Sequence, residues 1–200
     1  MITKTRQLRL SPRTPIWGLR PQAARPIPPP MMSPRIVRPT AVLIDKSESM
    51  GHAIELGRQV LRLISPLCQG RLYAYAFDTG AYAIQRNTDD VGRWDAALSR
   101  MIPGGFKACG AAIDSMRRQG EYVEQLVLIT DQRENANPTF VETYRAYAME
   151  MGVRPEVCII KPLDSSGWLE HRCRETGVPF EVLAIDGDEK ELTSLIPLLA

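Results

Sequence analysis

One carboxylate and two hydroxyls follow a short apolar run at alternate positions. They belong to Asp45, Ser47 and Ser49, and the run before them is Ala-Val-Leu-Ile at 41–44. Such oxygen atoms are hard ligands that suit Mg²⁺ or Mn²⁺ and suit zinc or copper poorly. Serine and aspartate before a helix are also typical N-cap residues, so the same spacing fits simple helix capping. This stretch alone leaves both interpretations open.

The run 41–44 predicts a buried strand of a parallel sheet, because it is continuously apolar, partly β-branched and begins just behind Pro39. In open α/β sheets, ligands bind in the crevice at the carboxyl ends of the strands. A second run of this kind, at 125–130, is followed by Asp131. We therefore expect Asp45 and Asp131 to lie at the same edge of one sheet.

The rest of the chain alternates between helical and extended patterns. Apolar residues recur at helical spacing over 51–67, 89–101, 107–118, 138–151, 168–176 and 189–199. Strand patterns cover 71–77, 81–84, 125–130, 155–160 and 178–185. The alternation predicts an α/β fold with a doubly wound, mostly parallel sheet of about six strands flanked by helices. The short strand 81–84 is expected to pair antiparallel at a sheet edge.

The first 38 residues differ from the rest and predict a basic, proline-rich tail, extended or disordered, ahead of a domain at 39–200. The tail has no acidic residue, and its bases are Lys4, Arg6, Arg9, Arg13, Arg20, Arg25, Arg35 and Arg38. Residues 40–200 carry 17 bases and 23 acids, a net charge of −6. The tail fits an arm that binds RNA, an anionic surface or an acidic partner, or a solvated linker lying on its own or a neighbouring acidic domain.

Apolar segments and cysteine spacing also indicate in which cellular compartment the protein is expected. The chain contains no run of 18 apolar residues, so no membrane span is expected, and no secretory signal pattern is present at its N-terminus. The cysteines lie far apart, at Cys68, Cys109, Cys158 and Cys173. Widely spaced cysteines in apolar segments indicate buried free thiols and a reducing, cytoplasmic location.

The sequence lacks the residues that several enzyme classes require. The sequence has no glycine-rich loop of the NTPase or dinucleotide type. A haloacid-dehalogenase-type phosphatase needs a second carboxylate where Ser47 stands, and the two histidines, His52 and His171, are too few for a convincing triad. We expect a non-enzymatic binding module, with a weak metal-dependent hydrolase as an alternative.

Three motifs occur in one order: Asp-Lys-Ser-Glu-Ser-Met at 45–50, Gly-Gly at 104–105 and Thr-Asp at 130–131. The first resembles the metal-ion-dependent adhesion site (MIDAS), Asp-x-Ser-x-Ser-Met, of von Willebrand factor A domains. The segment 126–138 is most similar to the carboxyl-terminal A-type domain of Ro autoantigen (TROVE) proteins. The resemblance covers about residues 40–185 and implies a Rossmann-like fold.

The resemblance implies that Asp45, Ser47 and Ser49 bind Mg²⁺ or Mn²⁺ directly and that Asp131 binds it through water. One position departs from the pattern, because Lys107 aligns with the threonine ligand that normally follows the double glycine. An ammonium group cannot ligate a cation. At about 4 Å and an effective dielectric constant near 20, two unit charges interact by roughly 4 kcal/mol, and a divalent ion doubles the repulsion. Lys107 either weakens or replaces the ion by pairing with both aspartates, or points to solvent and leaves the ligands free.

The resemblance further implies a protein-interaction module that recognises an acidic side chain on a protein partner. Candidate contact residues around the site are Lys46, Glu48, Asp78, Phe106 and Glu134. If Lys107 replaces the metal, its ammonium and the helix N-termini could still attract a carboxylate. An RNA-associated, Ro-like role through the basic tail is the alternative, and a structural subunit whose tail threads into a neighbour is a third.

Overall fold

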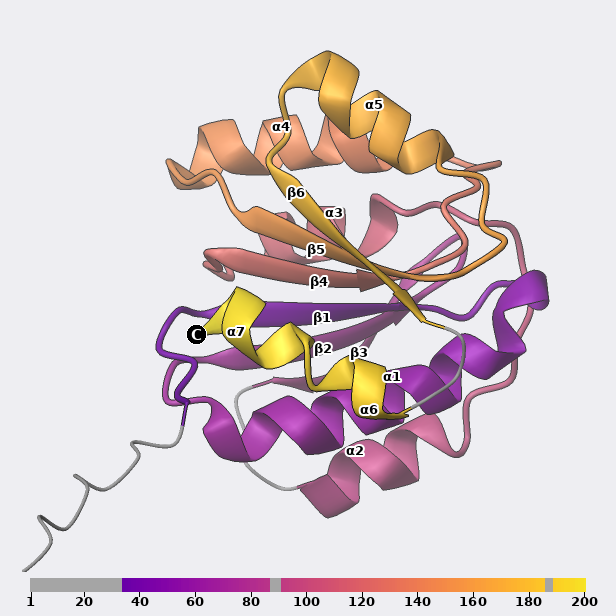
Figure 1. Cartoon of the computed structure of the whole chain (residues 1–200). Helices are drawn as coiled ribbons and strands as arrows, with labels where there is room; N and C mark the ends of the chain where they lie inside the picture. The colour runs from indigo at the N-terminus through magenta and orange to yellow at the C-terminus, as the bar shows by residue number, and fades with distance from the viewer. Residues whose placement is uncertain (1–33, 87–90, 186–188) are drawn as a thin grey trace, which may run out of the picture. The chain divides into compact units, whose positions relative to one another are not determined.

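The computed structural model of the chain describes residues 34–86, 91–185 and 189–200 (Figure 1). The predictions for the tail bases from Lys4 to Arg25 therefore lie outside the described residues, as does the predicted helix start at 89–90.

A six-stranded sheet forms the centre of the domain, in the order β3-β2-β1-β4-β5-β6 (Figure 1). Its strands are β1 (Thr40–Asp45), β2 (Leu72–Phe77), β3 (Ala81–Arg86), β4 (Gln125–Ile129), β5 (Glu156–Pro162) and β6 (Phe180–Ile185). All neighbours pair in parallel except β2 and β3, whose antiparallel hairpin places β3 at the edge. The predicted doubly wound, mostly parallel sheet is confirmed.

Helices cover both faces of this sheet (Figure 1). One face carries α3 (Ala111–Arg118), α4 (Phe140–Met151) and α5 (Trp168–Thr176). The other carries α1 (Gly51–Ile64), α2 (Val91–Leu98), α6 (Glu189–Leu192) and α7 (Leu195–Leu199). Two 3₁₀ turns, η1 (Glu48–Met50) and η2 (Ser65–Leu67), flank α1.

The continuous apolar run of β1 results from burial on both faces. Leu43 packs in the core under α3 and α4, while Val42 and Ile44 pack in the core under α1, and all three are fully buried. Helix α1 approaches closely at Gly57, where an added Cβ would lie 2.4 Å from Ile44 Cδ1. The central position of β1 fixes where its terminal carboxylate emerges.

Two of the predicted helices differ clearly from the structure. The helix predicted from Lys107 begins at Ala111, because residues 107–110 form a loop in which the Gly110 amide donates to the Pro138 carbonyl over 3.0 Å. The helix predicted over 189–199 is two short helices. Pro197 has no amide hydrogen for the Thr193 carbonyl, so the helical hydrogen-bonding pattern is interrupted.

One residue ahead of position 39 also packs on the domain. Ile36 is fully buried and forms a parallel bridge with Cys68. None of the four cysteines forms a disulfide. Cys109, Cys158 and Cys173 are buried, as predicted, whereas Cys68 is only partly buried. Among the described residues, no helix has the length and apolar character needed to cross a membrane.

Candidate functional site

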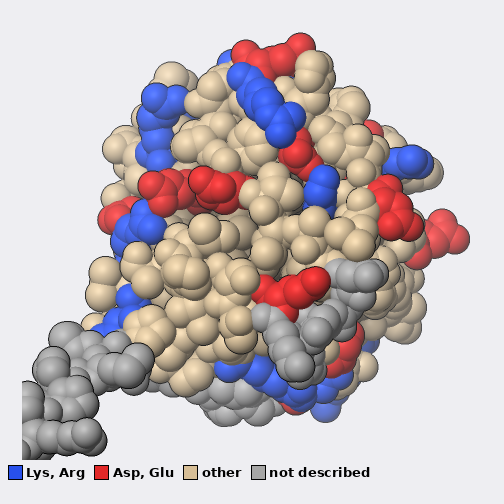
Figure 2. Space-filling model, in the orientation of Figure 1, with Lys and Arg blue, Asp and Glu red and all other residues tan. Residues whose placement is uncertain are grey.

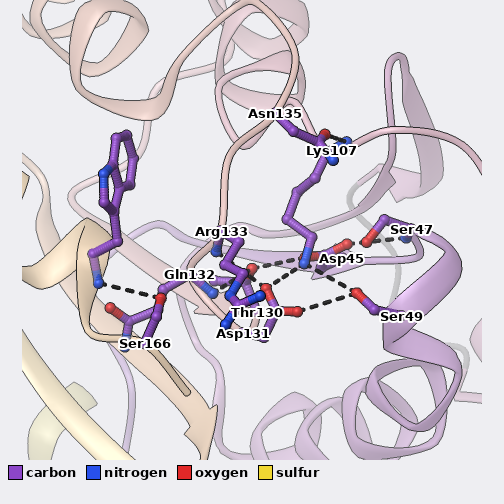
Figure 3. Close-up of polar contacts among 11 residues, drawn as sticks. Asp45, Ser47, Ser49, Lys107, Thr130, Asp131, Gln132, Arg133, Asn135 and Ser166 are labelled. Atoms are coloured by element: carbon purple, nitrogen blue, oxygen red, sulfur yellow. Dashed lines mark hydrogen bonds and ion pairs between the residues drawn. The ribbon is translucent and has the colours of Figure 1, made fainter.

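The candidate site lies at the carboxyl edge of the sheet, on the right-hand side of Figure 1. Because β1 is hydrogen-bonded in parallel to β4, Asp45 and Asp131 reach the same edge. The loop 102–110, here called the glycine loop, closes the site (Figure 3). Its Gly104 amide donates to the Lys46 carbonyl and its Ala108 amide to the Asp78 carbonyl, each over 2.9 Å.

Asp45 is fully buried at the end of β1 and uses both carboxylate oxygens (Figure 3). Its Oδ1 accepts the Ser47 backbone N–H over 2.9 Å, which fixes the turn after the strand. Its Oδ2 accepts the Thr130 hydroxyl over 2.7 Å and lies 3.1 Å from the Lys107 Nζ. Asp45 therefore links β1, the end of β4 and the glycine loop.

Lys107 points into the site and is only 3% exposed. Its ammonium forms ion pairs with Asp131 and Asp45 and lies 3.4 Å from the Ser49 hydroxyl (Figure 3). The backbone is held as well, because the Lys107 amide donates to Asn135 Oδ1 over 2.6 Å and its carbonyl accepts the Asn135 amide over 3.1 Å. These are the contacts that the ion-replacement hypothesis predicts, and the solvent-facing alternative is not the observed orientation.

Asp131 completes the group at the end of β4. Its carboxylate accepts the Ser49 hydroxyl and the Arg133 amide, each over 3.1 Å, in addition to the Lys107 ammonium. Burial raises the pKa of Asp131, but the hydrogen bonds from Lys107 and Arg133 and the positive charge of Lys107 outweigh it, so the pKa lies below its ordinary value. Asp131 is ionised at neutral pH.

Ser47 is the exception among the predicted ligands. Its side chain is 3% exposed, and its hydroxyl oxygen has no hydrogen-bond partner among the described residues. The oxygen atoms present suit a divalent ion chemically. The Lys107 ammonium, however, lies where an ion would contact both carboxylates, and the described residues contain no cluster of three or more His, Cys, Asp or Glu side chains that could hold a metal. With Lys107 in this position, the site does not fit Mg²⁺ or Mn²⁺.

A second lysine lies beside this group. Lys46 pairs with the buried carboxylate of Asp78 and lies 4.8 Å from the centre of the Tyr82 ring. Burial raises the pKa of Asp78, but hydrogen bonds from Lys46 and the Gly80 amide lower it further, leaving it below its ordinary value. Gly105 has φ +84° and packs against Asp78, where an added Cβ would be 3.2 Å from the carboxylate. Lys46 and Asp78 face each other, and their predicted partner contacts remain predictions.

The other predicted contact residues divide between structural and exposed positions. Glu134 Oε1 accepts the Phe140 amide over 2.6 Å and so caps α4, while burial raises its pKa to about 7. Phe106 is 67% exposed on the glycine loop, and Glu48 is exposed on η1. Phe106 and Glu48 are therefore open to a partner.

The turn after β1, the glycine loop and the loop after β4 line a pocket of about 420 Å³ that is open to solvent. It is lined by Ser47, Glu48, Ser49, Gly105, Phe106, Lys107, Asp131, Arg133 and Asn135. The sequence did not point to Arg133 or Asn135, and it gave Thr130 only as part of the Thr-Asp motif, without a role at the site. Their proximity to Asp131, within one loop after a buried strand, is the signal that could have identified them. Arg133 is exposed and forms no ion pair with any residue that the structure describes.

The two tail arginines within the described residues lie outside this pocket. Arg38 pairs with Glu156, at the amino-terminal end of β5, over 2.6 Å. Arg35 is exposed. Neither residue contributes to the lining of the pocket.

The sheet order and the three converging loops define a von Willebrand A-like domain. Solved structures support this fold. BatB from Bacteroides thetaiotaomicron is 19% identical with a TM-score of 0.58, covering 80% of this chain and 96% of its own. A von Willebrand factor type A protein from Catenulispora acidiphila is 14% identical with a TM-score of 0.60, covering 81% and 41%.

A third similar structure, proximal thread matrix protein 1 from the mussel byssus, has a zinc-occupied MIDAS motif. It is 16% identical with a TM-score of 0.60, covering 82% of this chain and 47% of its own. No family model and no curated protein sequence matches the chain. At these identities, the structural likeness establishes the fold.

Proposed function

We propose that this protein is a non-enzymatic protein-interaction module whose pocket recognises an acidic group on a partner. The observation that carries the proposal is the pocket at the carboxyl edge of the sheet, where exposed Phe106 and Arg133 lie beside a charge-paired lysine. An exposed aromatic ring and an exposed guanidinium are the side chains that most often anchor protein interfaces.

Arg133 is the cation that would meet the acidic group. The three N–H donors of the Lys107 ammonium already face Asp45, Asp131 and Ser49, so Lys107 has no donor left for a partner. Arg133 has no ion pair with the described residues, and a guanidinium binds carboxylates in a bidentate manner. Phe106 would supply the apolar contact next to it.

The proposal assigns no catalytic role to the site. Asp45 is fully buried and shared between Thr130 and Lys107, so it is not positioned to act as a base on a bound substrate. The Ser47 hydroxyl has no hydrogen-bonded base among the described residues to activate it. We also propose a cytoplasmic location, on the sequence argument from the widely spaced cysteines.

A selection of random peptides displayed on phage against the immobilised full-length protein tests the proposal. We expect the selected peptides to share an Asp or Glu next to an apolar residue. Synthetic versions should lose at least about tenfold in affinity for Arg133→Gln, since a charge-assisted hydrogen bond contributes about 1.5–3 kcal/mol. Arg71→Gln is the matched control, because Arg71 is an exposed arginine just before β2. Selection without acidic residues, or equal binding by Arg133→Gln, would contradict the proposal.

An RNA-associated role through the tail is the second candidate, favoured by its eight bases without an acid. The face of the domain in Figure 2 shows basic and acidic side chains interspersed, without a continuous basic surface. RNA binding that weakens steeply with salt and disappears on deletion of residues 1–33 would support this role. Residues 34–38 should be kept, because Ile36 is buried in the domain. The similarity to Ro proteins rests on the sequence motif at 126–138.

A further inference from the structure

We infer that Lys107 is a built-in cation that takes the place of a divalent ion, and that the oxygen atoms around it form a latent Mg²⁺ or Mn²⁺ site that opens only when Lys107 is replaced. The ammonium contacts oxygen atoms from three separate segments: the end of β1, the η1 turn and the end of β4. Lys107 joins these segments by charge and hydrogen bonds, as a coordinated ion would (Figure 3).

The Ser47 hydroxyl provides an independent observation. It is buried in the turn between β1 and η1 and has no partner in the described part of the chain, although buried hydroxyls are normally hydrogen-bonded. An ammonium has three donors, and here all three already face oxygen atoms. An ion with six coordination positions would have a place for a further hydroxyl. The unpartnered Ser47 hydroxyl thus indicates an oxygen set larger than a lysine can satisfy.

The charges indicate why wild type should exclude the metal. Two carboxylates and one ammonium sum to −1, from −2 and +1. Replacing Lys107 by a neutral residue leaves −2, which a divalent ion neutralises. Adding the ion beside Lys107 would instead place two cations within a few ångströms of each other next to the buried Asp45, where their repulsion is screened less than in bulk water.

The inference rests on the proposed function only for the location of the site. Its test measures metal binding, and peptide binding is a separate measurement. A failure of metal binding in the variant would leave the peptide result unaffected, and the reverse also holds.

The test is a calorimetric titration of MnCl₂ into the full-length protein and its variants. We expect Lys107→Thr to bind one Mn²⁺ ion with at least about 100-fold higher affinity than wild type, because threonine removes the repelling charge and adds an oxygen ligand. The double variant Lys107→Thr/Asp131→Asn should lose most of that gain. Lys161→Thr is the matched control, because Lys161 also forms a part-buried ion pair, with Glu170 at 2.6 Å.

Two results would overturn the inference: equal Mn²⁺ binding by wild type and Lys107→Thr, or a folded Lys107→Thr that binds none. If this variant folds only with metal, its melting temperature should rise with MnCl₂ while that of Lys161→Thr does not. Wild type provides a measurement that needs no variant. An amine-modifying reagent, read by mass spectrometry, should label Lys107 more slowly than Lys46 and Lys161, with and without EDTA. Fast labelling of Lys107, or labelling that EDTA accelerates, would contradict its role as the resident cation.

Discussion

Two lysines at the same edge of the sheet, one part-buried and one buried, form different kinds of ion pair. Lys46, 12% exposed, faces one carboxylate, that of Asp78, which also accepts the Gly80 amide over 2.9 Å. Lys107, 3% exposed, faces two carboxylates from neighbouring strands. The first pair is balanced in charge, whereas the second retains one negative charge.

The difference shows what each lysine does for the fold. Lys46 joins the ends of β1 and β2, and its replacement leaves one carboxylate, that of Asp78, without a cation. Lys107 joins β1, η1 and β4, so its removal leaves two neighbouring carboxylates without a cation. An unpaired buried charge is much more costly than the pair is stabilising. The two lysines should therefore differ strongly when each is neutralised.

The largest expected effect is that of Lys107→Met. Methionine keeps much of the side-chain volume but supplies no charge, so Asp131 and the fully buried Asp45 repel each other without a cation between them. We expect a loss of about 3–5 kcal/mol in the free energy of unfolding, measured by urea denaturation. Adding Asp131→Asn should restore part of this loss. An unchanged midpoint for Lys107→Met would show that the pairing contributes nothing to the fold.

Lys46→Met should cost less, about 1–3 kcal/mol, because only one carboxylate loses its cation and Asp78 keeps the Gly80 amide and the Tyr82 hydroxyl as donors. The same urea measurement applies. The comparison between the two lysines would fail if Lys46→Met were as destabilising as Lys107→Met.

Much of this site could be predicted from the sequence, because strand ends determine it. Continuous apolar runs identified β1 and β4 as buried parallel strands, and parallel neighbours must deliver Asp45 and Asp131 to one edge. The antiparallel edge hairpin followed from its turn residues. These features depend on local pattern and a few rules of topology.

The sequence left two directions open for Lys107, toward both aspartates or toward solvent, because the choice depends on contacts between distant residues. The glycine loop is held by Asn135 Oδ1, which accepts the Lys107 amide, and by Gly110, where an added Cβ would lie 2.3 Å from the Thr139 carbonyl oxygen. Helical periodicity at 107–118 instead suggested a helix that would have begun at Lys107. Loop conformations fixed by such long-range hydrogen bonds leave little trace in local sequence pattern.

Glu134 can be compared with Asp131, because no lysine is among the groups that shift its pKa. Asp131 has a lowered pKa beside Lys107, whereas burial raises the pKa of Glu134 to about 7, with the carboxylate of Glu142 adding to the rise and Phe140 N–H, Arg172 and Cys109 opposing it. Between the unfolded value, about 4.5, and about 7, the folded state binds more protons. The free energy of unfolding contributed by Glu134 therefore falls as pH rises through this window.

Glu134→Gln should remove this dependence, because glutamine can still accept the Phe140 amide but does not ionise. At pH 8, the free energy of unfolding of the variant should exceed that of wild type by about 1 kcal/mol. This is less than a value of 1.36 kcal/mol per pKa unit would give, because the carboxylate keeps its backbone donor and is partly solvated. Urea denaturation at about pH 5 and pH 8 measures the change, with exposed Glu181→Gln as the control. A pH slope identical to that of wild type would mean that Glu134 ionises normally in the fold.

The smallest expected effect separates a lysine-filled site from a metal-filled one. In wild type, the Ser47 hydroxyl is buried without a partner in the described residues, so Ser47→Ala removes no hydrogen bond and relieves an unsatisfied polar atom. We expect the free energy of unfolding to change by less than about 0.5 kcal/mol, while Ser49→Ala, which loses the bond to Asp131, costs about 1 kcal/mol. In the Lys107→Thr background, we expect Ser47→Ala to lower the affinity for Mn²⁺ more than Ser49→Ala does, because Ser47 would then have an ion to bind. A large loss for Ser47→Ala in wild type would instead mean that the hydroxyl already has a partner, such as a bound water, so that it would no longer indicate an unfilled coordination position.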